Sequence, residues 1–418
     1  MKYLYLVLLN FVFLTFSFGQ EVEFKAGAAK RVITPEPLIS VSGGVGSPKP
    51  VTMKKGDLFV RAVAFEKGDE RVAIVSIDNL GWPAVLGNKS RALIKGIPPE
   101  NILIGVTHTH SAPDAYAFPD EKGNIGADLD YLDWCVVQIA DAVNEAIENL
   151  EPANLKIAVD EAKGKIAYNY YAPDLYDPRC GVIQAINING KPIATLVNYA
   201  THPEIIGSDR GILSPDLCGP LYDKIEKEVG GMALFMNSAQ GGMVTADNRL
   251  ENGEEANDWA ECVRNGELLA DEALRIVNTA SIQENPELFC TNKVVEFQVE
   301  SELMQAILNG SPLMEGAFDK NKVSTVVNLL NIGTAQVLTI PGEALPNIGF
   351  YLKRKMQTEH PFLFGLTNDA FGYMLTKVDF NSFDRYNYIC RTSLSENVGE
   401  IFIDEALNLI QNSPVPEK

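Results

Sequence analysis

The sequence has few cysteines, and no two of them form a Cys-x-x-Cys pair. The six cysteines are spread along the chain, at positions 135, 180, 218, 262, 290 and 390. Thiolate zinc sites are usually built from closely spaced cysteine pairs, so this spacing argues against such a site. An oxidising compartment would permit disulfides, but the sequence leaves open whether the cysteines pair or remain buried thiols.

Basic side chains are also scarce. Lysine and arginine together number 35, against 55 aspartates and glutamates, and the formal net charge at pH 7 is −20. Such an acidic chain is repelled by phosphate backbones and by anionic lipid headgroups. The composition therefore argues against nucleic acid or an anionic membrane surface as the main partner, and it leaves the oligomeric state open.

The chain has one long apolar run, at residues 4–18, and no second run long enough to span a bilayer. Crossing a bilayer takes about 20 apolar residues, and this run is shorter. Lys2 precedes it and Gly19-Gln20 follow it, which is typical of a cleavable signal peptide. No cysteine follows the run, so we expect no lipid anchor there. We predict a signal peptide over residues 1–20, a mature chain over residues 21–418, and a secreted or periplasmic location.

From residue 21 to residue 413 the sequence lacks a long linker, a low-complexity tract and an internal repeat. Strand-like runs alternate with helical runs, which is typical of an α/β fold. The turn signal Asn189-Gly190 joins two strands as a hairpin, so the sheets are expected to be mixed. We predict layered mixed β-sheets flanked by helices in a single large domain. The expected strands are 57–65, 71–77, 155–159, 181–188, 192–199, 233–236, 293–299, 323–330 and 335–340, and the expected helices are 131–150, 221–229, 257–278 and 345–357.

Histidine is rarer still, with four in the chain, yet three of them end two apolar segments. His108 and His110 follow the run at 101–107, and His202 follows the run at 194–201. Residues i and i+2 of an extended chain point to the same face, so we expect His108 and His110 to point the same way, with Thr109 opposite. Neutral imidazole is the commonest metal ligand, and catalytic zinc sites typically use three protein ligands. The pattern predicts a metallohydrolase.

Four further loops follow strand ends and carry polar side chains. One brings out Glu343 after a Pro-Gly pair, and a second, residues 235–248, holds glycines that could leave amide groups free for an oxyanion. A third loop ends at Tyr373, and a fourth carries Tyr386 and Tyr388, which alternate as if on one face. Together these loops could supply metal ligands, hydrogen-bond donors and a hydroxyl nucleophile.

These motifs, in this order, resemble those of the neutral (non-lysosomal) ceramidases, specifically their catalytic N-terminal domain. The resemblance covers nearly all of residues 21–418 and is carried by residues 26–35, 107–113, 198–203, 214–219, 237–241, 341–343, 372–373 and the tyrosine loop at 385–393. It implies a lipid or other small-molecule substrate and a zinc ion held by His108, His202, Glu343 and Tyr373. It also implies that His110 is an acid–base or oxyanion group and that Tyr386 or Tyr388 assists at the substrate carbonyl.

Three departures separate the chain from that family. The serine of the ceramidase Gly-Asp-Val-Ser-Pro-Asn segment falls on Val244 without a gap, or on Thr245 with one inserted residue. The arginine of the family's Asn-Arg motif corresponds to Tyr170, so that cation is missing or comes from Arg179 or Arg391. We also expect residues 21–418 to form the catalytic domain without a C-terminal immunoglobulin-like domain. These departures concern the substrate and the nucleophile, and they leave the metal ligands in place.

Three functions are consistent with these residues. The favoured one is a zinc-dependent amidase of lipid metabolism, which uses zinc-activated water on an N-acyl compound such as a ceramide-like lipid or an N-acylated sugar or amine. The second is a zinc hydrolase of an ester or glycosidic bond on the same scaffold, which the changes at Thr245 and Tyr170 suggest. The third is a non-catalytic metal-binding or ligand-binding homologue, which the loss of the serine suggests.

Overall fold

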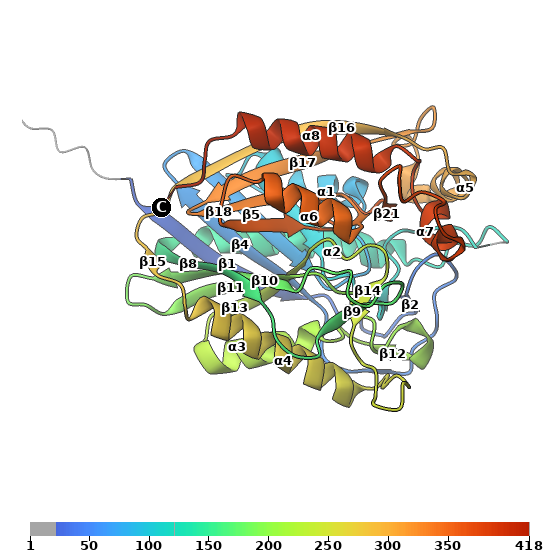
Figure 1. Ribbon diagram of the computed structural model, residues 1–418, viewed down its shortest axis with the longest axis horizontal. Helices are drawn as coiled ribbons and strands as arrows, with labels where there is room; N and C mark the ends of the chain where they lie inside the picture. The colour runs from blue at the N-terminus through green and yellow to red at the C-terminus, as the bar shows by residue number, and fades with distance from the viewer. Residues whose placement is uncertain (1–21, 121, 418) are drawn as a thin grey trace, which may run out of the picture.

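The structure of the chain, a computed structural model, describes residues 22–120 and 122–417, so the predicted signal peptide lies outside the described residues. Two β-sheets pack face to face between layers of helices (Figure 1). Helices α3 and α4 lie on one side of the sheets, and α6 and α8 lie on the other. The predicted layered mixed sheets flanked by helices are confirmed. In the part of the chain that the structure describes, no helix is both long and apolar enough to cross a membrane.

The larger sheet has the strand order β13-β11-β10-β8-β1-β4-β5-β6, and β15 pairs with β8. In chain order its strands are β1 (Phe24–Val32), β4 (Phe59–Lys67), β5 (Glu70–Ile77), β6 (Ile102–Val106), β8 (Glu151–Glu161), β10 (Arg179–Asn187), β11 (Pro192–Tyr199), β13 (Met232–Asn237) and β15 (Ile282–Gln283). The smaller sheet has the order β16-β17-β18-β20, with bounds Leu288–Gln298, Lys322–Ile332, Ala335–Thr339 and His360–Phe364.

The helices that cover the sheets are α1 (Ala84–Arg91), α2 (Leu129–Glu148), α3 (Cys218–Val229), α4 (Trp259–Val277), α5 (Glu302–Gly310), α6 (Pro346–Lys355), α7 (Asn387–Arg391) and α8 (Val398–Asn412). Short paired strands tie the loops together: β2 (Val41–Ser42) with β7 (Ala112–Pro113), β3 (Met53–Lys54) with β12 (Ile212–Leu213), β9 (Ala167–Asn169) with β14 (Val244–Ala246), and β19 (Glu343–Ala344) with β21 (Tyr373–Met374).

Local sequence signals explain several of these elements. The Asp128 side chain accepts a hydrogen bond from the Tyr131 amide at 3.0 Å and caps the start of α2. Strands β10 and β11 form the predicted hairpin, with Gly190 at φ 78 in its turn. Strand pairs β5–β6, β11–β13 and β18–β20 are parallel, whereas β4–β5 and β16–β17 are antiparallel. Each predicted strand and helix is present, with its ends shifted by a few residues.

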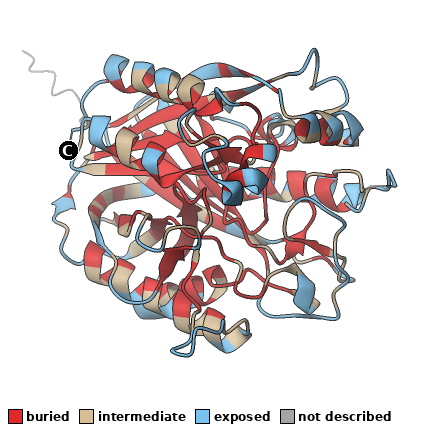
Figure 2. Cartoon of the chain, turned by 45° about the vertical axis from the view of Figure 1, so that its right-hand side comes forward, coloured by how far each residue is buried: buried red, intermediate tan, exposed pale blue. Residues whose placement is uncertain are grey.

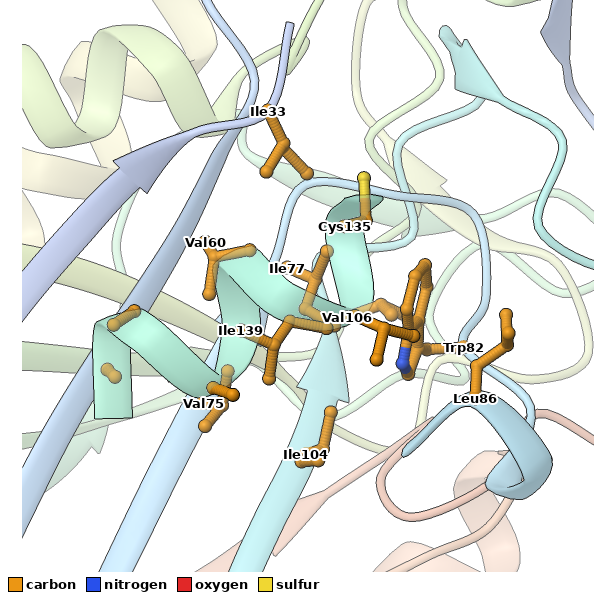
Figure 3. Close-up of a cluster of buried hydrophobic side chains, with 14 of the residues drawn as sticks. Ile33, Val60, Val75, Ile77, Trp82, Leu86, Ile104, Val106, Cys135 and Ile139 are labelled. Carbon is orange, nitrogen blue, oxygen red and sulfur yellow. The ribbon is translucent and has the colours of Figure 1, made fainter. Parts of the chain in front are cut away.

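Apolar side chains fill every space between the layers. One cluster lies between the two sheets and includes Ile74 and Phe362. A second lies between the larger sheet and helices α1 and α2, where Ile139 and Trp82 meet strands β4, β5 and β6 (Figure 3). Figure 2 shows that buried residues follow the strands and the inner faces of the helices. All six cysteines are free thiols, and all but Cys290 are buried.

The larger sheet curls so strongly that its two edge regions, β6 and β13, lie against each other. Strands β1 and β8 pair over only a short stretch, Lys25 opposite Pro152 and Ala26 opposite Glu151. Beyond this joint, the Ser76 hydroxyl of β5 donates a hydrogen bond to the Phe235 carbonyl of β13 at 2.5 Å. The curl brings the carboxyl ends of β6 and β11 together, although these strands are far apart in the order of the sheet.

Candidate metal centre

Strand β6 ends at Val106, and the chain then turns sharply through His108. This residue has φ 70, in the left-handed region that side chains other than glycine rarely adopt. The expectation that His108 and His110 share one face of an extended strand is therefore wrong. The turn still brings the two imidazoles together, with ring centroids 4.9 Å apart and ring planes at 89°. Backbone strain of this kind is concentrated at functional sites.

His202 joins this pair from the loop after β11. Its ring centroid lies 4.8 Å from that of His108 and 5.6 Å from that of His110. Asn237, at the end of β13, holds the two loops at this spacing. Its side-chain amide donates to the carbonyl of Thr107 at 3.1 Å and to the carbonyl of Thr201 at 2.7 Å. Each of these carbonyls belongs to the residue directly before a histidine.

Two of the three imidazoles direct one ring nitrogen outward to a backbone carbonyl. The Nδ1 of His108 hydrogen-bonds the Leu80 carbonyl, and the Nδ1 of His202 hydrogen-bonds the Val244 carbonyl at 2.6 Å. A carbonyl oxygen only accepts, so both Nδ1 atoms carry a proton and donate it. One ring nitrogen from each of His108, His110 and His202 lies within 4.8 Å of the others. This group of buried nitrogens could hold a metal ion.

Glu343 brings a carboxylate to the same point from the smaller sheet. Its Oε2 lies 3.0 Å from Nε2 of His202 and 3.7 Å from Nε2 of His108. The short strand β19 that begins at Glu343 pairs in parallel with β21, which places Tyr373 directly beside it. Both side chains are buried. Loops that follow both sheets thus meet at one centre. The histidines come from loops after β6 and β11 of the larger sheet, and Glu343 and Tyr373 come from loops after β18 and β20 of the smaller sheet.

The electrostatics of the centre follow from its burial. Burial lowers the pKa of His108 and of His110 to about 3, so both imidazoles are neutral at physiological pH. Burial also disfavours the charged form of His202, but the hydrogen bond with Glu343 and the nearby carboxylates outweigh it and raise the His202 pKa to about 9. His202 and Glu343 therefore form a buried ion pair, and a divalent cation bound between them would replace the His202 proton.

A pocket opens over the centre. His108, His110, Glu343, Tyr373 and Tyr388 contribute its polar groups, and its apolar wall comes from Val45, Leu80, Phe118, Met304, Ile307 and Ala370. Ligand pockets are commonly apolar with a few converging polar groups, and this one fits that description. Five of the eight site residues predicted from the sequence therefore line this pocket, and His202 lies next to it, in contact with Glu343.

Thr245 and Tyr386 do not line this pocket. Thr245 lies in strand β14 and lines a neighbouring pocket with Tyr170 and Glu204. Tyr386 is buried and packs against Tyr171, with ring centroids 5.4 Å apart. Tyr386 and Tyr388 do not share a face, because a 3₁₀ turn and helix α7 replace the expected extended segment. Thr245 and Tyr386 thus lie outside the histidine pocket, whereas Tyr388 lines it.

The arginine expected from the resemblance to ceramidases has no counterpart among the described residues that line the histidine pocket. Arg179 is bound to Asp177, with Nε to Oδ1 at 2.7 Å. Arg391 lines a different pocket beside Glu300 and Glu302. Tyr170 stands where the family arginine would be, and it is largely exposed. Val244, the ungapped match to the family serine, is buried and acts through its backbone carbonyl as the His202 anchor.

Two features of the centre were missed by the sequence reasoning. Glu204 approaches His110, with Oε2 at 3.3 Å from Nδ1. Its position two residues after His202 is the sequence feature that could have pointed to it. Met243 places its sulfur 3.4 Å from the Tyr373 hydroxyl, which donates to it. Met243 adopts φ 67, a conformation that the glycine-rich loop imposes and that no local pattern signals.

The residues of the centre fit zinc. Nε2 of His110 is buried and has no hydrogen-bond partner among the described residues, which is costly for a polar atom unless a cation or water satisfies it. Two or three imidazole nitrogens with one carboxylate are a common ligand set for catalytic zinc. Burial raises the pKa of Tyr373 well above its usual range, so its phenolate form would depend on a bound cation.

The fold matches solved ceramidase structures, whereas no family model and no curated protein matches the sequence. The neutral ceramidase from Pseudomonas aeruginosa aligns with a TM-score of 0.76 and 18% identity, over 96% of this chain and 76% of that chain. A ceramidase complexed with C2 aligns with a TM-score of 0.74 and 16% identity, over 95% of this chain and 77% of that chain. The chain therefore has the neutral ceramidase fold, as the sequence motifs predicted.

Proposed function

We propose that the chain is an exported zinc-dependent hydrolase that cleaves the amide bond of an N-acyl compound. The observation that carries this proposal is the convergence of His108, His202, Glu343 and Tyr373, from both sheets, at the base of one largely apolar pocket. The ceramidase fold supports amides as the first substrates to try. A ceramide-like lipid, an N-acylated sugar and an N-acylated amine are the candidate substrates.

His108, His202, Glu343 and Tyr373 would hold the zinc ion, which when bound supplies an activated water and polarises a carbonyl. The residues around it would orient the substrate. The apolar wall formed by Phe118, Met304 and Ile307 suits an acyl group, because burying it there removes apolar surface from water.

Proton transfer falls to the two remaining polar groups of the pocket. His110 presents an unpartnered Nε2, and Tyr388 lies over the same pocket with its pKa raised by burial to about 12. A phenol in this state remains protonated, so it could donate a hydrogen bond to the carbonyl oxygen of the substrate. Neutral His110 could accept a proton and pass it to the leaving amine.

The first experiment is the metal content of purified protein, measured by mass spectrometry for wild type, His202→Ala and His360→Ala. His360 lies in β20 and outside the pocket, which makes it the matched control. We expect about one zinc per chain in wild type and in His360→Ala, and its loss in His202→Ala. Absence of zinc from wild type after incubation with zinc would contradict the proposed metal centre.

The second experiment is a substrate panel with zinc-loaded wild type and His202→Ala. N-acyl sphingoid bases, N-acetylated sugars and N-acyl amines would be tested beside esters and glycosides that carry the same groups. We expect zinc-dependent cleavage of at least one amide. Turnover of esters or glycosides with inert amides would replace the amidase assignment, and a zinc-bound protein without any turnover would favour the binding-protein alternative.

A further inference from the structure

The three histidines of the metal centre differ in what anchors Nδ1. His108 and His202 use backbone carbonyls, those of Leu80 and Val244. His110 instead faces a carboxylate, because Glu204 Oε2 lies 3.3 Å from its Nδ1. Histidine residues at metal sites usually have such an outer partner, which fixes both the ring orientation and the tautomer.

The backbone around Glu204 holds this contact in place. The His110 amide donates to the carbonyl of Pro203 at 3.1 Å, and the Glu204 amide donates back to the carbonyl of His202 at 3.0 Å. The Ser111 hydroxyl adds a bond to the Gly207 carbonyl at 2.9 Å. The loop after β11 therefore clamps the His110 segment at several points, so the Glu204 side chain starts from a fixed position.

We infer that Glu204 is a positioning residue that keeps the proton of His110 on Nδ1 and turns its bare Nε2 toward the metal centre. This inference rests on the proposed function only in placing His110 at that centre. A neutral imidazole has two tautomers of similar energy, and a carboxylate beside Nδ1 strongly favours the one with a proton there. That tautomer leaves a lone pair on the buried Nε2, which has no partner among the described residues.

Glu204 also borders the neighbouring pocket, together with Tyr168, Tyr170, Thr245 and Glu255. Glu255 is exposed and has no ion-pair or hydrogen-bond contact with His110 among the described residues. It is the natural control, because replacing it changes the charge of the same pocket by the same amount. An effect of Glu204 that Glu255 shares would be a general electrostatic effect and not positioning.

The test uses zinc affinity and the His110 tautomer, so it does not depend on finding a substrate. Full-length wild type, Glu204→Ala, Glu204→Gln and Glu255→Gln would be labelled with ¹⁵N-histidine. The tautomer of each ring follows from its nitrogen shifts and its two-bond couplings to carbon-bound protons. Zinc affinity follows from competition with a chelator, and thermal melting checks that each variant folds.

We expect wild-type His110 to carry its proton on Nδ1. Glu204→Ala should lose this single tautomer, so that part of the protein carries the His110 proton on Nε2. Zinc affinity should fall as well, because a proton on Nε2 faces the metal centre and disfavours a cation there. Glu204→Gln should restore the tautomer and most of the affinity, because its amide oxygen also accepts the Nδ1 proton. Glu255→Gln should match wild type in both measurements.

Two results would overturn the inference. One is a wild-type His110 with its proton on Nε2, which needs no variant at all. The other is a folded Glu204→Ala protein with wild-type tautomer and zinc affinity. A wild type that binds zinc with the expected tautomer but cleaves no amide would contradict the proposed function and leave the role of Glu204 standing.

Discussion

Asn237 sets the spacing of the two histidine loops of the candidate metal centre with one side chain. Its two amide protons bind the carbonyls that precede His108 and His202, and its Oδ1 accepts from the amides of Ser238 and Thr201 at 3.0 and 3.3 Å. The residue is fully buried, so water cannot replace a lost hydrogen bond there, and losing one costs free energy of folding. Only an amide side chain offers two donors and an acceptor in this shape.

Asn237→Asp tests this role with the smallest possible change. Aspartate lacks the donors and places a carboxylate against two carbonyl oxygens. We expect a loss of about 2–6 kcal/mol in the free energy of unfolding, because each of the two buried acceptors left unsatisfied costs about 1–3 kcal/mol. Zinc content should fall as well, since the loops separate. Urea unfolding and metal analysis check both points, and a variant as stable as wild type would show that the loops hold their spacing without Asn237.

At the scale of elements, the loops of the smaller sheet are fixed by close backbone contact. The chain at Gly241, after β13, passes directly over the segment that carries Glu343. The Gly241 amide donates to the Ala344 carbonyl at 2.9 Å. A Cβ at position 241 would lie only 2.1 Å from the Glu343 carbonyl oxygen, a backbone atom that a rotamer change cannot move. The glycine thus allows Glu343 to reach the point where the histidines meet.

Gly241→Ala should therefore displace Glu343 and weaken zinc binding. We expect this variant to lose bound zinc and to melt at a lower temperature, as measured by metal analysis and calorimetry. Gly190→Ala is the control variant. The added Cβ would meet open space there, so this variant tests only the backbone strain of a left-handed residue, about 1–2 kcal/mol. If both variants kept zinc equally well, close packing at Gly241 would not be what positions Glu343.

The elements themselves could be predicted from the sequence, because period-2 and period-3.6 patterns are local. The hairpin at Asn189-Gly190 and the capped helix α2 are examples. The histidines and Glu343, which meet at the candidate metal centre, could be predicted because their motifs stand at strand ends. The turn at His108 and the displacement of Thr245 and Tyr386 could not be predicted, since tertiary contacts decide them. Glu204 could have been noticed as a carboxylate two residues after His202. Its contact with His110 could not be predicted, because His110 lies on a distant segment of the chain.

At the scale of the whole molecule, the curled sheet gathers distant segments and buries several carboxyl groups among them. Asp369, in the loop after β20, is one of these. Its Oδ1 accepts from the amide of Ala84, at the start of α1, at 3.2 Å and from the amide of Ala370 at 3.0 Å. Burial raises the pKa of Asp369 to about 7, although these amides and Arg91 favour its charged form. The fold therefore contains an acid that holds its proton far above its usual pH range.

This raised pKa makes stability depend on pH with a defined sign. Between about pH 4 and pH 7 folded Asp369 keeps a proton that the unfolded chain has released, so its contribution to stability falls as the pH rises through this window. Asp369→Asn removes the ionisation and keeps an oxygen that can accept from both amides. Relative to wild type, the variant should gain stability as the pH rises, by up to about 4 kcal/mol at pH 8, at about 1.36 kcal/mol per pKa unit.

Urea unfolding of both proteins from pH 4 to pH 8 checks this difference. The contributions of all other titratable groups to the pH dependence cancel in the comparison, because the two proteins share those groups. Asp120→Asn is the control, because hydrogen bonds from Asn124 lower the pKa of Asp120 and its carboxylate is ionised in the folded and the unfolded chain over nearly all of this pH range. The stability difference between that variant and wild type should therefore stay nearly constant from pH 4 to pH 8. A difference between Asp369→Asn and wild type that did not change with pH would mean that Asp369 ionises in the folded protein as freely as in the unfolded chain. Its burial by the loop, α1 and the smaller sheet would then impose no electrostatic cost.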